Sequence, residues 1–113
     1  MKKHYAVDLL YRLSEGRQVE MYGWVKARRK HNHTIFLDIV DSTGFIQVVL
    51  DEDRLGVEAY NLAKKISLES AVKATGIIVN TGRPKPYFRE ILVDSIETIG
   101  PAVLQVSPHP RSD

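Results

Sequence analysis

Alternation of apolar and polar residues between Val19 and Leu50 is the feature that most constrains how this chain can fold. A period of two residues is typical of half-buried β-strands, whose successive side chains point to opposite faces. Short polar turns at 31–33 and 41–44 divide the alternation into three runs. The residues expected to face inward are Val19, Met21, Gly23, Val25 and Ala27, then Ile35, Leu37 and Ile39, then Ile46, Val48 and Leu50. The pattern predicts three consecutive strands joined by tight turns.

The opposite faces of these strands carry an unusual combination of side chains. The residues expected to face outward are Lys26 and Arg28, then Thr34, Phe36 and Asp38, then Phe45, Gln47 and Val49. An exposed ring and an exposed amide are therefore predicted to lie beside cations. Cations attract phosphates, a ring can stack on a base, and an amide can hydrogen-bond to a base edge. This combination suits single-stranded nucleic acid.

The remainder of the chain predicts helices and two more strands. Tyr5–Leu13 is expected to form a short helix that covers one end of a barrel, and 18–30 a long strand that bends at Gly23. One helix is predicted after Asp51, with Asp51 or Asp53 as its N-cap. Its apolar residues at helical spacing are Leu55, Ala59, Leu62, Ala63 and Ile66.

Two further strands are predicted over 71–80 and 89–99, the second with a bulge near Asp94 and Ser95. Three strands, a helix and two strands is the order of the five-stranded Greek-key OB barrel. The predicted fold class is therefore all-β with short helices, one at the N-terminus and one between strands three and four. The expected organisation is an N-terminal lead-in over 1–17, a barrel over 18–100 and an extended, proline-bearing, linker-like tail over 101–113.

Length and composition limit the classes of function. A chain of 113 residues can form one domain with a modest core. A net charge of +2 is too small to indicate a partner, but six of the eight residues at 26–33 are Lys, Arg or His. The chain has no cysteine, which fits a reducing compartment, and no apolar run near the roughly 20 residues that span a bilayer. The expected location is the cytoplasm, without membrane contact.

The sequence contains no motif typical of an enzyme. We find no Walker-type glycine loop for phosphates and no nucleophile elbow. His31 and His33 are neighbours on a predicted hairpin, and no third residue at metal-ligand spacing accompanies them. We expect no metal site, no cofactor and no catalytic residue in this chain.

Three segments resemble a known family. They are GWVKARRKHNHTIFLDIVDSTGFIQVV, LESAVKATGIIV and REILVDSIETIGPA. They resemble the N-terminal OB-fold anticodon-binding domain of the class IIb aminoacyl-tRNA synthetases, the asparaginyl and aspartyl enzymes, and most of all asparaginyl enzymes of archaeal type. The resemblance implies a tRNA anticodon stem-loop as partner. In a full-length protein it also implies a class II catalytic domain in cis and a homodimer, with this chain alone acting as a binding domain.

The resemblance also assigns roles to individual residues. It implies that Arg29, Phe36 and Gln47 engage the central anticodon uridine, and that Glu90 helps to recognise a flanking base. Simple alternation turns Arg29 inward, so this role requires a bulge or a twisted end in the first long strand. The remaining cations of that strand are expected to contact the RNA backbone without reading bases. These are Lys26, Arg28 and Lys30.

Two other classes of function stay open at this point. One is a general single-stranded nucleic-acid module, which would bind many sequences by stacking. The other is a protein-interaction OB domain, in which Phe36 and Trp24 would be hot spots. Within the predicted barrel we expect Trp24 to be buried against the N-terminal helix rather than stacked on a base.

Overall fold

The structure is a computed structural model that describes residues 3–99 and 105–106. The elements in chain order are β1 (Lys3–His4), α1 (Ala6–Tyr11), β2 (Gln18–His31), β3 (Thr34–Asp41), β4 (Gly44–Asp51), α2 (Glu52–Leu55), α3 (Val57–Ala63), β5 (Ala71–Asn80), β6 (Arg89–Ile99) and β7 (Gln105–Val106). The bounds of β5 and β6 equal those predicted from the sequence, and β2 extends one residue beyond its predicted end.

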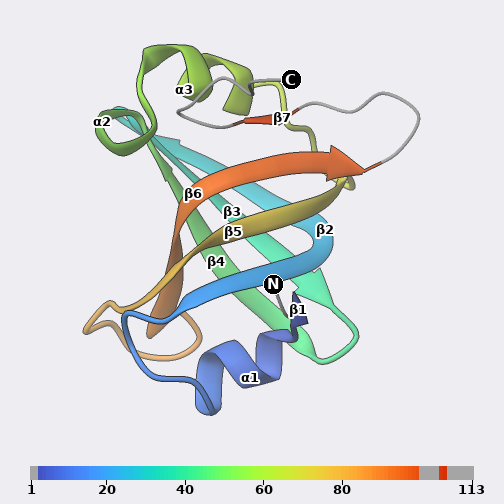
Figure 1. Ribbon diagram of the computed structural model, residues 1–113, viewed down its shortest axis with the longest axis vertical. Helices are drawn as coiled ribbons and strands as arrows, with labels where there is room; N and C mark the ends of the chain where they lie inside the picture. Colours follow the sequence, from blue (N-terminus) through green and yellow to red (C-terminus); the bar gives the residue numbers. More distant parts are fainter. Residues whose placement is uncertain (1–2, 100–104, 107–113) are drawn as a thin grey trace.

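Five long strands close into a barrel (Figure 1). They are hydrogen-bonded in the order β2, β3, β4, β6, β5, and β5 pairs back with β2. Every pairing in this circuit is antiparallel except that between β4 and β6, which is parallel. Closure leaves none of these strands with an unpaired edge along its whole length. The fold is the predicted five-stranded OB barrel.

The long strand β2 serves both sides of the barrel. Its first half pairs with β5 and its second half with β3, and Trp24 pairs with both. Gly23 lies at this changeover, where a Cβ atom would be 2.5 Å from the carbonyl oxygen of Val40. No other residue type fits so close to a neighbouring backbone, so the bend predicted at Gly23 depends on the missing side chain.

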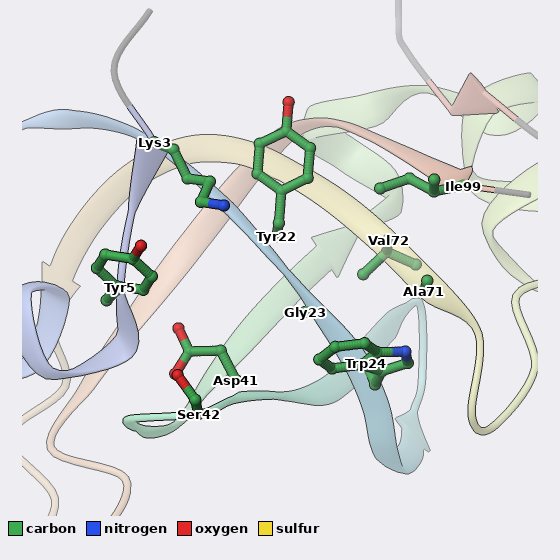
Figure 2. A pocket seen from close by; sticks show the side chains of 10 residues that line it. All are labelled: Lys3, Tyr5, Tyr22, Gly23, Trp24, Asp41, Ser42, Ala71, Val72 and Ile99. Carbon is green, nitrogen blue, oxygen red and sulfur yellow. The ribbon is translucent and has the colours of Figure 1, made fainter.

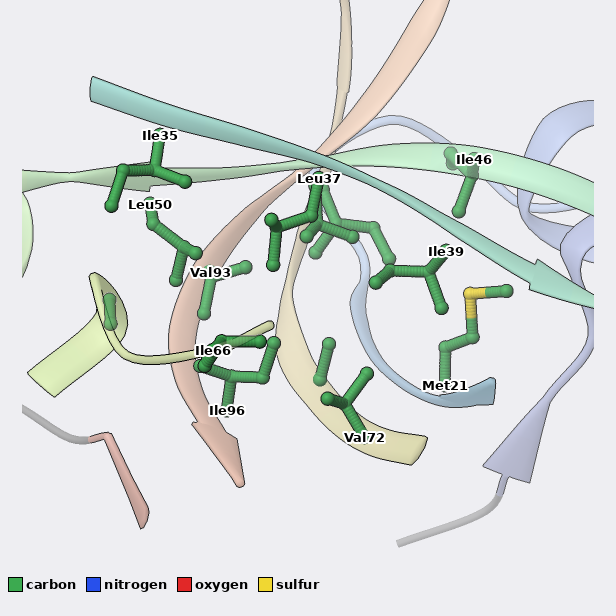
Figure 3. Close-up of a cluster of buried hydrophobic side chains, with 14 of the residues drawn as sticks. Met21, Ile35, Leu37, Ile39, Ile46, Leu50, Ile66, Val72, Val93 and Ile96 are labelled. Atoms are coloured by element: carbon green, nitrogen blue, oxygen red, sulfur yellow. The ribbon is translucent and has the colours of Figure 1, made fainter. Parts of the chain in front are cut away.

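The core fills the barrel with the predicted inward faces of the strands (Figure 3). Val19, Met21, Ile35, Leu37 and Ile39 are all fully buried. The same holds for the alternating residues of the later strands, namely Ile46, Val48, Leu50, Val72, Ala74, Ile78, Ile91, Val93 and Ile96. Removing these apolar side chains from water is the main term that stabilises the fold.

Helices cover the two ends of the barrel (Figure 1). At one end α1 buries Ala6 and Leu9, and Arg89 of β6 donates hydrogen bonds to the carbonyls of Leu9 and Leu13. This is the cover predicted for the N-terminal helix. At the other end α2 and α3 bury their apolar faces, among them Leu55, Ala59, Tyr60 and Ala63.

The prediction of one continuous helix after Asp51 is wrong. Gly56 has a φ of +91° and separates α2 from α3, because this backbone conformation cannot continue a right-handed helix. Asp51 stands at the N-cap of α2 but makes no side-chain capping bond. Its carboxylate instead accepts a hydrogen bond from the hydroxyl of Thr34 at 3.4 Å. The helical spacing of buried residues was nevertheless correct for Leu55, Ala59, Ala63 and Ile66.

The predicted tail can be followed only in part. Gln105 and Val106 form β7, which pairs antiparallel with β6 opposite Glu97 and Ile96. The rest of the predicted tail, 101–104 and 107–113, lies outside the described residues. Among the residues that are described, no helix is long and apolar enough to cross a membrane.

Candidate nucleic-acid interface

A bulge in β2 decides which of its cations face the outside of the barrel. Val25 pairs with Ile39 but Ala27 pairs with Asp38, so Lys26 is an extra residue in the strand. Beyond it the alternation is reversed, and Arg29 pairs with Phe36 on the outer face. Of the two irregularities that would fit the family role of Arg29, a bulge or a twisted strand end, the structure has the bulge. The outward orientation predicted for Arg28 and the inward one predicted for Ala27 are wrong.

Arg29, Asp38, Gln47 and Glu90 form a connected polar network on this outer face. The last three lie side by side, because Asp38 pairs with Gln47 across β3 and β4, and Gln47 pairs with Glu90 across β4 and β6. Nη1 and Nη2 of Arg29 donate to the Asp38 carboxylate at 3.2 and 2.6 Å. Nη2 also donates to Oε1 of Gln47 at 3.0 Å, and Nε2 of Gln47 donates to Glu90 at 2.8 Å.

The neighbours of Gln47 fix the orientation of its amide. A guanidinium can only donate and an ionised carboxylate can only accept, so the amide oxygen must face Arg29 and the amide nitrogen must face Glu90. Only 3% of Gln47 is exposed. The expectation of an exposed amide is thus wrong, because the side chains of the network cover it. The side chain of Arg29 is 43% exposed, so Arg29 is more accessible to solvent than Gln47.

The loop between β5 and β6 contributes Tyr87 to the network. Its hydroxyl donates to Asp38 Oδ2 at 3.0 Å, and its ring centroid lies 5.3 Å from the guanidinium carbon of Arg29 and 5.6 Å from that of Arg83. Phe45 of β4 meets the Tyr87 ring edge-on at 5.9 Å. Burial raises the pKa of Tyr87, and its hydrogen bond to Asp38 raises it further. The hydrogen bond to Asp38 likewise raises the pKa of Arg29, against an opposing effect of burial.

Phe36 adds an aromatic surface beside the network. It is half-buried on the outer face, next to Arg29 on one side and opposite Val49 of β4 on the other. Glu90 lies on the other side of Gln47 from Arg29, and its carboxylate is 3.7 Å from the guanidinium of Arg83. The structure thus brings together the four residues to which the family resemblance assigns a base-reading role, namely Arg29, Phe36, Gln47 and Glu90.

The other cations of β2 lie apart from this network. Lys26 is exposed and pairs with Glu69 at 3.2 Å. Arg28 donates to the carbonyl of Lys64, just after α3, and Lys30 pairs with Ile35, whose side chain faces the core. Because the bulge reverses the alternation, Arg28 lies toward the end of the barrel that α2 and α3 cover, and Lys30 shares a strand face with Arg28 rather than with Arg29.

A second aromatic cluster occupies a different outer face. Lys3, Tyr5, Tyr22 and Trp24 line a cavity of about 390 Å³ together with Gly23, Asp41, Ser42, Ala71, Val72 and Ile99 (Figure 2). The Lys3 ammonium lies 5.7 Å from the ring centroid of Tyr5 and 5.3 Å from that of Tyr22. Trp24 is 51% exposed, so the prediction that it is buried against the N-terminal helix is wrong. It turns outward because its neighbours Gly23 and Val25 fill the inward positions.

Asp38, Tyr87 and Arg83 belong to the site but were not identified from the sequence. For Asp38 a signal existed, because a carboxylate on a strand face between Phe36 and Val40 is an unusual neighbour for an apolar surface. No local pattern places Tyr87 or Arg83, since their loop folds back over β3 and β4 only in the closed barrel. In the described part of the chain, no group of three or more His, Cys, Asp or Glu side chains is arranged to hold a metal ion.

The network can act on a ligand in three ways. Arg29 offers positively charged donors, Glu90 offers a carboxylate acceptor, and Phe36 offers a ring face beside them. Donors, acceptors and a stacking surface held at fixed positions are what recognition of an unpaired base requires. The barrel and its strand order make the chain an OB-fold protein, and such an outer face is typical of the nucleic-acid-binding members of that class.

Residues 19–99 match the tRNA anticodon family of OB-fold nucleic acid binding domains, and the chain belongs to this family. It is 39% identical over 85 residues to the asparagine–tRNA ligase of Pyrococcus furiosus, an overlap that covers 75% of this chain and 19% of that protein. The chain therefore spans about a fifth of the length of this relative.

Solved structures share the fold of this chain. The asparaginyl-tRNA synthetase of Pyrococcus horikoshii in complex with asparaginyl-adenylate superposes with a TM-score of 0.78 at 34% identity, covering 97% of this chain and 24% of that one. The aspartyl-tRNA synthetase of Entamoeba histolytica, at 24% identity, has a TM-score of 0.74 and covers 97% and 22% of the two chains. An OBody bound to hen egg-white lysozyme, at 20% identity, shares the fold with a TM-score of 0.77 and covers 90% and 98%.

Proposed function

We propose that this domain binds the anticodon stem-loop of a tRNA as part of an asparaginyl- or aspartyl-tRNA synthetase, and that it reads the central anticodon uridine. The observation that carries this proposal is the hydrogen-bonded chain Arg29, Gln47, Glu90 beside Phe36 on one outer face. Membership of the anticodon family and the similarity to asparaginyl enzymes support the choice of RNA.

Each residue of the face has a distinct part in the proposed recognition. Phe36 stacks on the uracil ring, and Arg29 donates to a uracil carbonyl oxygen. Gln47, whose amide the network covers in the free protein, engages the uridine through Arg29 and Glu90, to which its amide oxygen and nitrogen are bonded. Glu90, at the edge next to the loop between β5 and β6, accepts a hydrogen bond from a flanking anticodon base.

The cations outside the network have a weaker role in this proposal. Lys26, Arg28 and Lys30 attract the RNA backbone without reading bases, and each adds to the salt dependence of binding. All three are exposed in the free protein, where Lys26 forms an ion pair with Glu69 and Arg28 donates to the neutral carbonyl of Lys64. Because Glu69 offsets the charge of Lys26, Lys26 is expected to contribute least of the three.

The proposal also concerns the protein of which this domain would be a part. A class II catalytic domain in cis would carry out aminoacylation, and the full-length form would be a homodimer. The 113 residues alone should bind tRNA without activating an amino acid. Exchange of pyrophosphate into ATP that depends on asparagine or aspartate, measured with the pure chain, would contradict this division of roles.

The test of base reading is a titration of the chain with two anticodon stem-loops that differ only in the central base. At matched salt we expect the stem-loop with a central uridine to bind more tightly, because only it matches the donors and acceptors of the face. Equal affinity for both stem-loops, together with equal affinity for single-stranded homopolymers, would instead indicate a general single-strand module. Weak binding of all RNAs that vanishes at physiological salt would indicate a protein-interaction domain.

A further inference from the structure

Arg29 is held in place far more tightly than a surface arginine that only attracts phosphates. Two of its nitrogens donate to the two carboxylate oxygens of Asp38, at 3.2 and 2.6 Å. A bidentate pair of this kind fixes the plane of the guanidinium as well as its position. The third bond, to Oε1 of Gln47 at 3.0 Å, leaves the group little freedom to turn.

Asp38 is itself held from the other side. It is only 7% exposed, and its Oδ2 accepts a hydrogen bond from the Tyr87 hydroxyl at 3.0 Å. The Tyr87 ring lies over the Arg29 guanidinium at 5.3 Å and is backed by Phe45. Tyr87 thus contacts both partners of the ion pair and connects them to the loop between β5 and β6.

We propose that Asp38 and Tyr87 are positioning residues that hold Arg29 as a base-edge donor and restrain it from acting as a general phosphate-binding cation. This inference rests on the proposed function, in which RNA binds the face that carries Arg29. Neither residue need touch the RNA. Asp38 aims the guanidinium and neutralises its charge, while Tyr87 holds Asp38 and covers one side of the guanidinium.

Asp38 has two roles, and their loss changes RNA affinity and base discrimination in opposite directions. A cation freed from its carboxylate can pair with any phosphate, which strengthens binding of all RNAs and increases the dependence on salt. A guanidinium that is no longer aimed loses its selectivity for one base edge. Removing the Asp38 charge should therefore lower discrimination without lowering general affinity.

The test uses Asp38→Asn in the stem-loop titration, with Glu97→Gln as the matched control. Both changes remove one negative charge, but Glu97 pairs with Lys73, near the opposite end of β6 from Glu90. We expect Asp38→Asn to reduce discrimination at the central base by about tenfold, the equivalent of one charged hydrogen bond. Its affinity for the stem-loop with the changed base should rise, and the salt slope should steepen by up to about one unit. Glu97→Gln should change the affinities for the two stem-loops by the same factor.

Two further variants show whether the effect passes through Arg29. In an Arg29→Ala background, Asp38→Asn should cause no further loss of discrimination, because the residue it positions is already gone. Tyr87→Phe removes only the hydroxyl and should shift discrimination in the same direction by a smaller factor. Full discrimination in Asp38→Asn, or an equal loss of affinity for both stem-loops with a fall in melting temperature, would overturn the proposal.

A measurement without RNA separates this inference from the proposed function. In protein labelled with nitrogen-15 at arginine, the guanidinium signals of Arg29 should show slow rotation in the wild type and fast rotation in Asp38→Asn. Unchanged signals would overturn the positioning role. If the signals change as expected but the wild type does not discriminate between the stem-loops, the positioning role holds and the proposed anticodon reading fails.

Discussion

The face around Arg29 and the face around Trp24 are built from similar residue types but are organised differently. Both combine aromatic rings with a cation. Around Arg29, hydrogen bonds of 2.6 to 3.2 Å link four polar side chains, so each donor and acceptor has one position. Around Trp24, three rings are among the residues that line a cavity of about 390 Å³, and Lys3 contacts those of Tyr5 and Tyr22 by cation–π interaction.

The difference shows what a surface needs in order to read a base. Rings and a cation are sufficient for attraction and stacking, which tolerate any sequence. Discrimination requires polar atoms whose direction is fixed before the ligand arrives, since a free side chain loses entropy when it is ordered. The face around Arg29 meets this requirement with four linked polar side chains. On the face around Trp24 the carboxylate of Asp41 is fixed by Ala6 and Thr43, but Lys3 meets the rings through cation–π contacts, which fix no donor direction.

Arg29→Ala should have the largest effect on RNA binding. A hydrogen bond to or from a charged group contributes about 1.5 to 3 kcal/mol, so affinity for the central-uridine stem-loop should fall about 10- to 150-fold, with discrimination lost as well. A titration of both stem-loops at one salt concentration measures this. If Arg28→Ala abolished discrimination and Arg29→Ala only changed the salt slope, the outward register of Arg29 would not be the one that binds RNA.

Phe36→Ala should weaken stem-loop binding by about 1 to 3 kcal/mol through the loss of base stacking. Because Phe36 is only half-buried, we expect the melting temperature of the Phe36→Ala variant to stay close to that of the wild type. The matched control is the adjacent Leu37→Ala, which empties a fully buried position and should lower the free energy of unfolding by about 2 to 5 kcal/mol. A comparable loss of stability in both variants would make Phe36 part of the core rather than of the binding face.

Lys26→Ala should weaken the binding of all RNAs to a similar, small extent. It should also lower the slope of log affinity against log salt concentration by about one unit or less. Its exposed ion pair with Glu69 contributes little to folding, so the unfolding midpoint should barely change. The measurement is the affinity for both stem-loops at several salt concentrations. Loss of discrimination in this variant would show that base reading extends beyond the network around Arg29.

The smallest effect is expected on the Trp24 face. Trp24 is the only tryptophan of the chain, so its fluorescence reports on this face alone. Saturation with the stem-loop should leave its emission nearly unchanged, and Trp24→Ala should leave RNA affinity within about twofold of the wild type. Strong quenching of Trp24 by bound RNA would remove the functional distinction between the two faces.

The fold could be predicted from the sequence because its signals are local. Alternating residues marked every long strand, and the bounds predicted for 71–80 and 89–99 are those of β5 and β6. The irregularity near Asp94 was also found, and it appears as a shift in register opposite Thr75 and Gly76. The break at Gly56 was missed, because the apolar spacing of residues 55–66 continues through it.

The site could be predicted only in part. Alternation predicts the outward positions of Phe36 and Gln47, whereas that of Arg29 follows only from the family resemblance or from the bulge at Lys26 in the structure. A bulge is one extra residue in a ladder, and it is defined by the partner strand as much as by its own sequence. The burial of Gln47 also depends on other parts of the chain, because the side chains that cover it come from other strands and from a distant loop.

The sequence by itself determined the strands, their inward faces and the gathering of rings and cations on the outer surface, because a period of two is a property of each strand alone. Only the tertiary structure decided how those outer side chains are connected. Asp38 from β3 and Tyr87 from the loop before β6 are 49 residues apart, yet 3.0 Å separates their oxygens. Closing the barrel brings such groups together, and their mutual hydrogen bonds turn a set of polar residues into one fixed site.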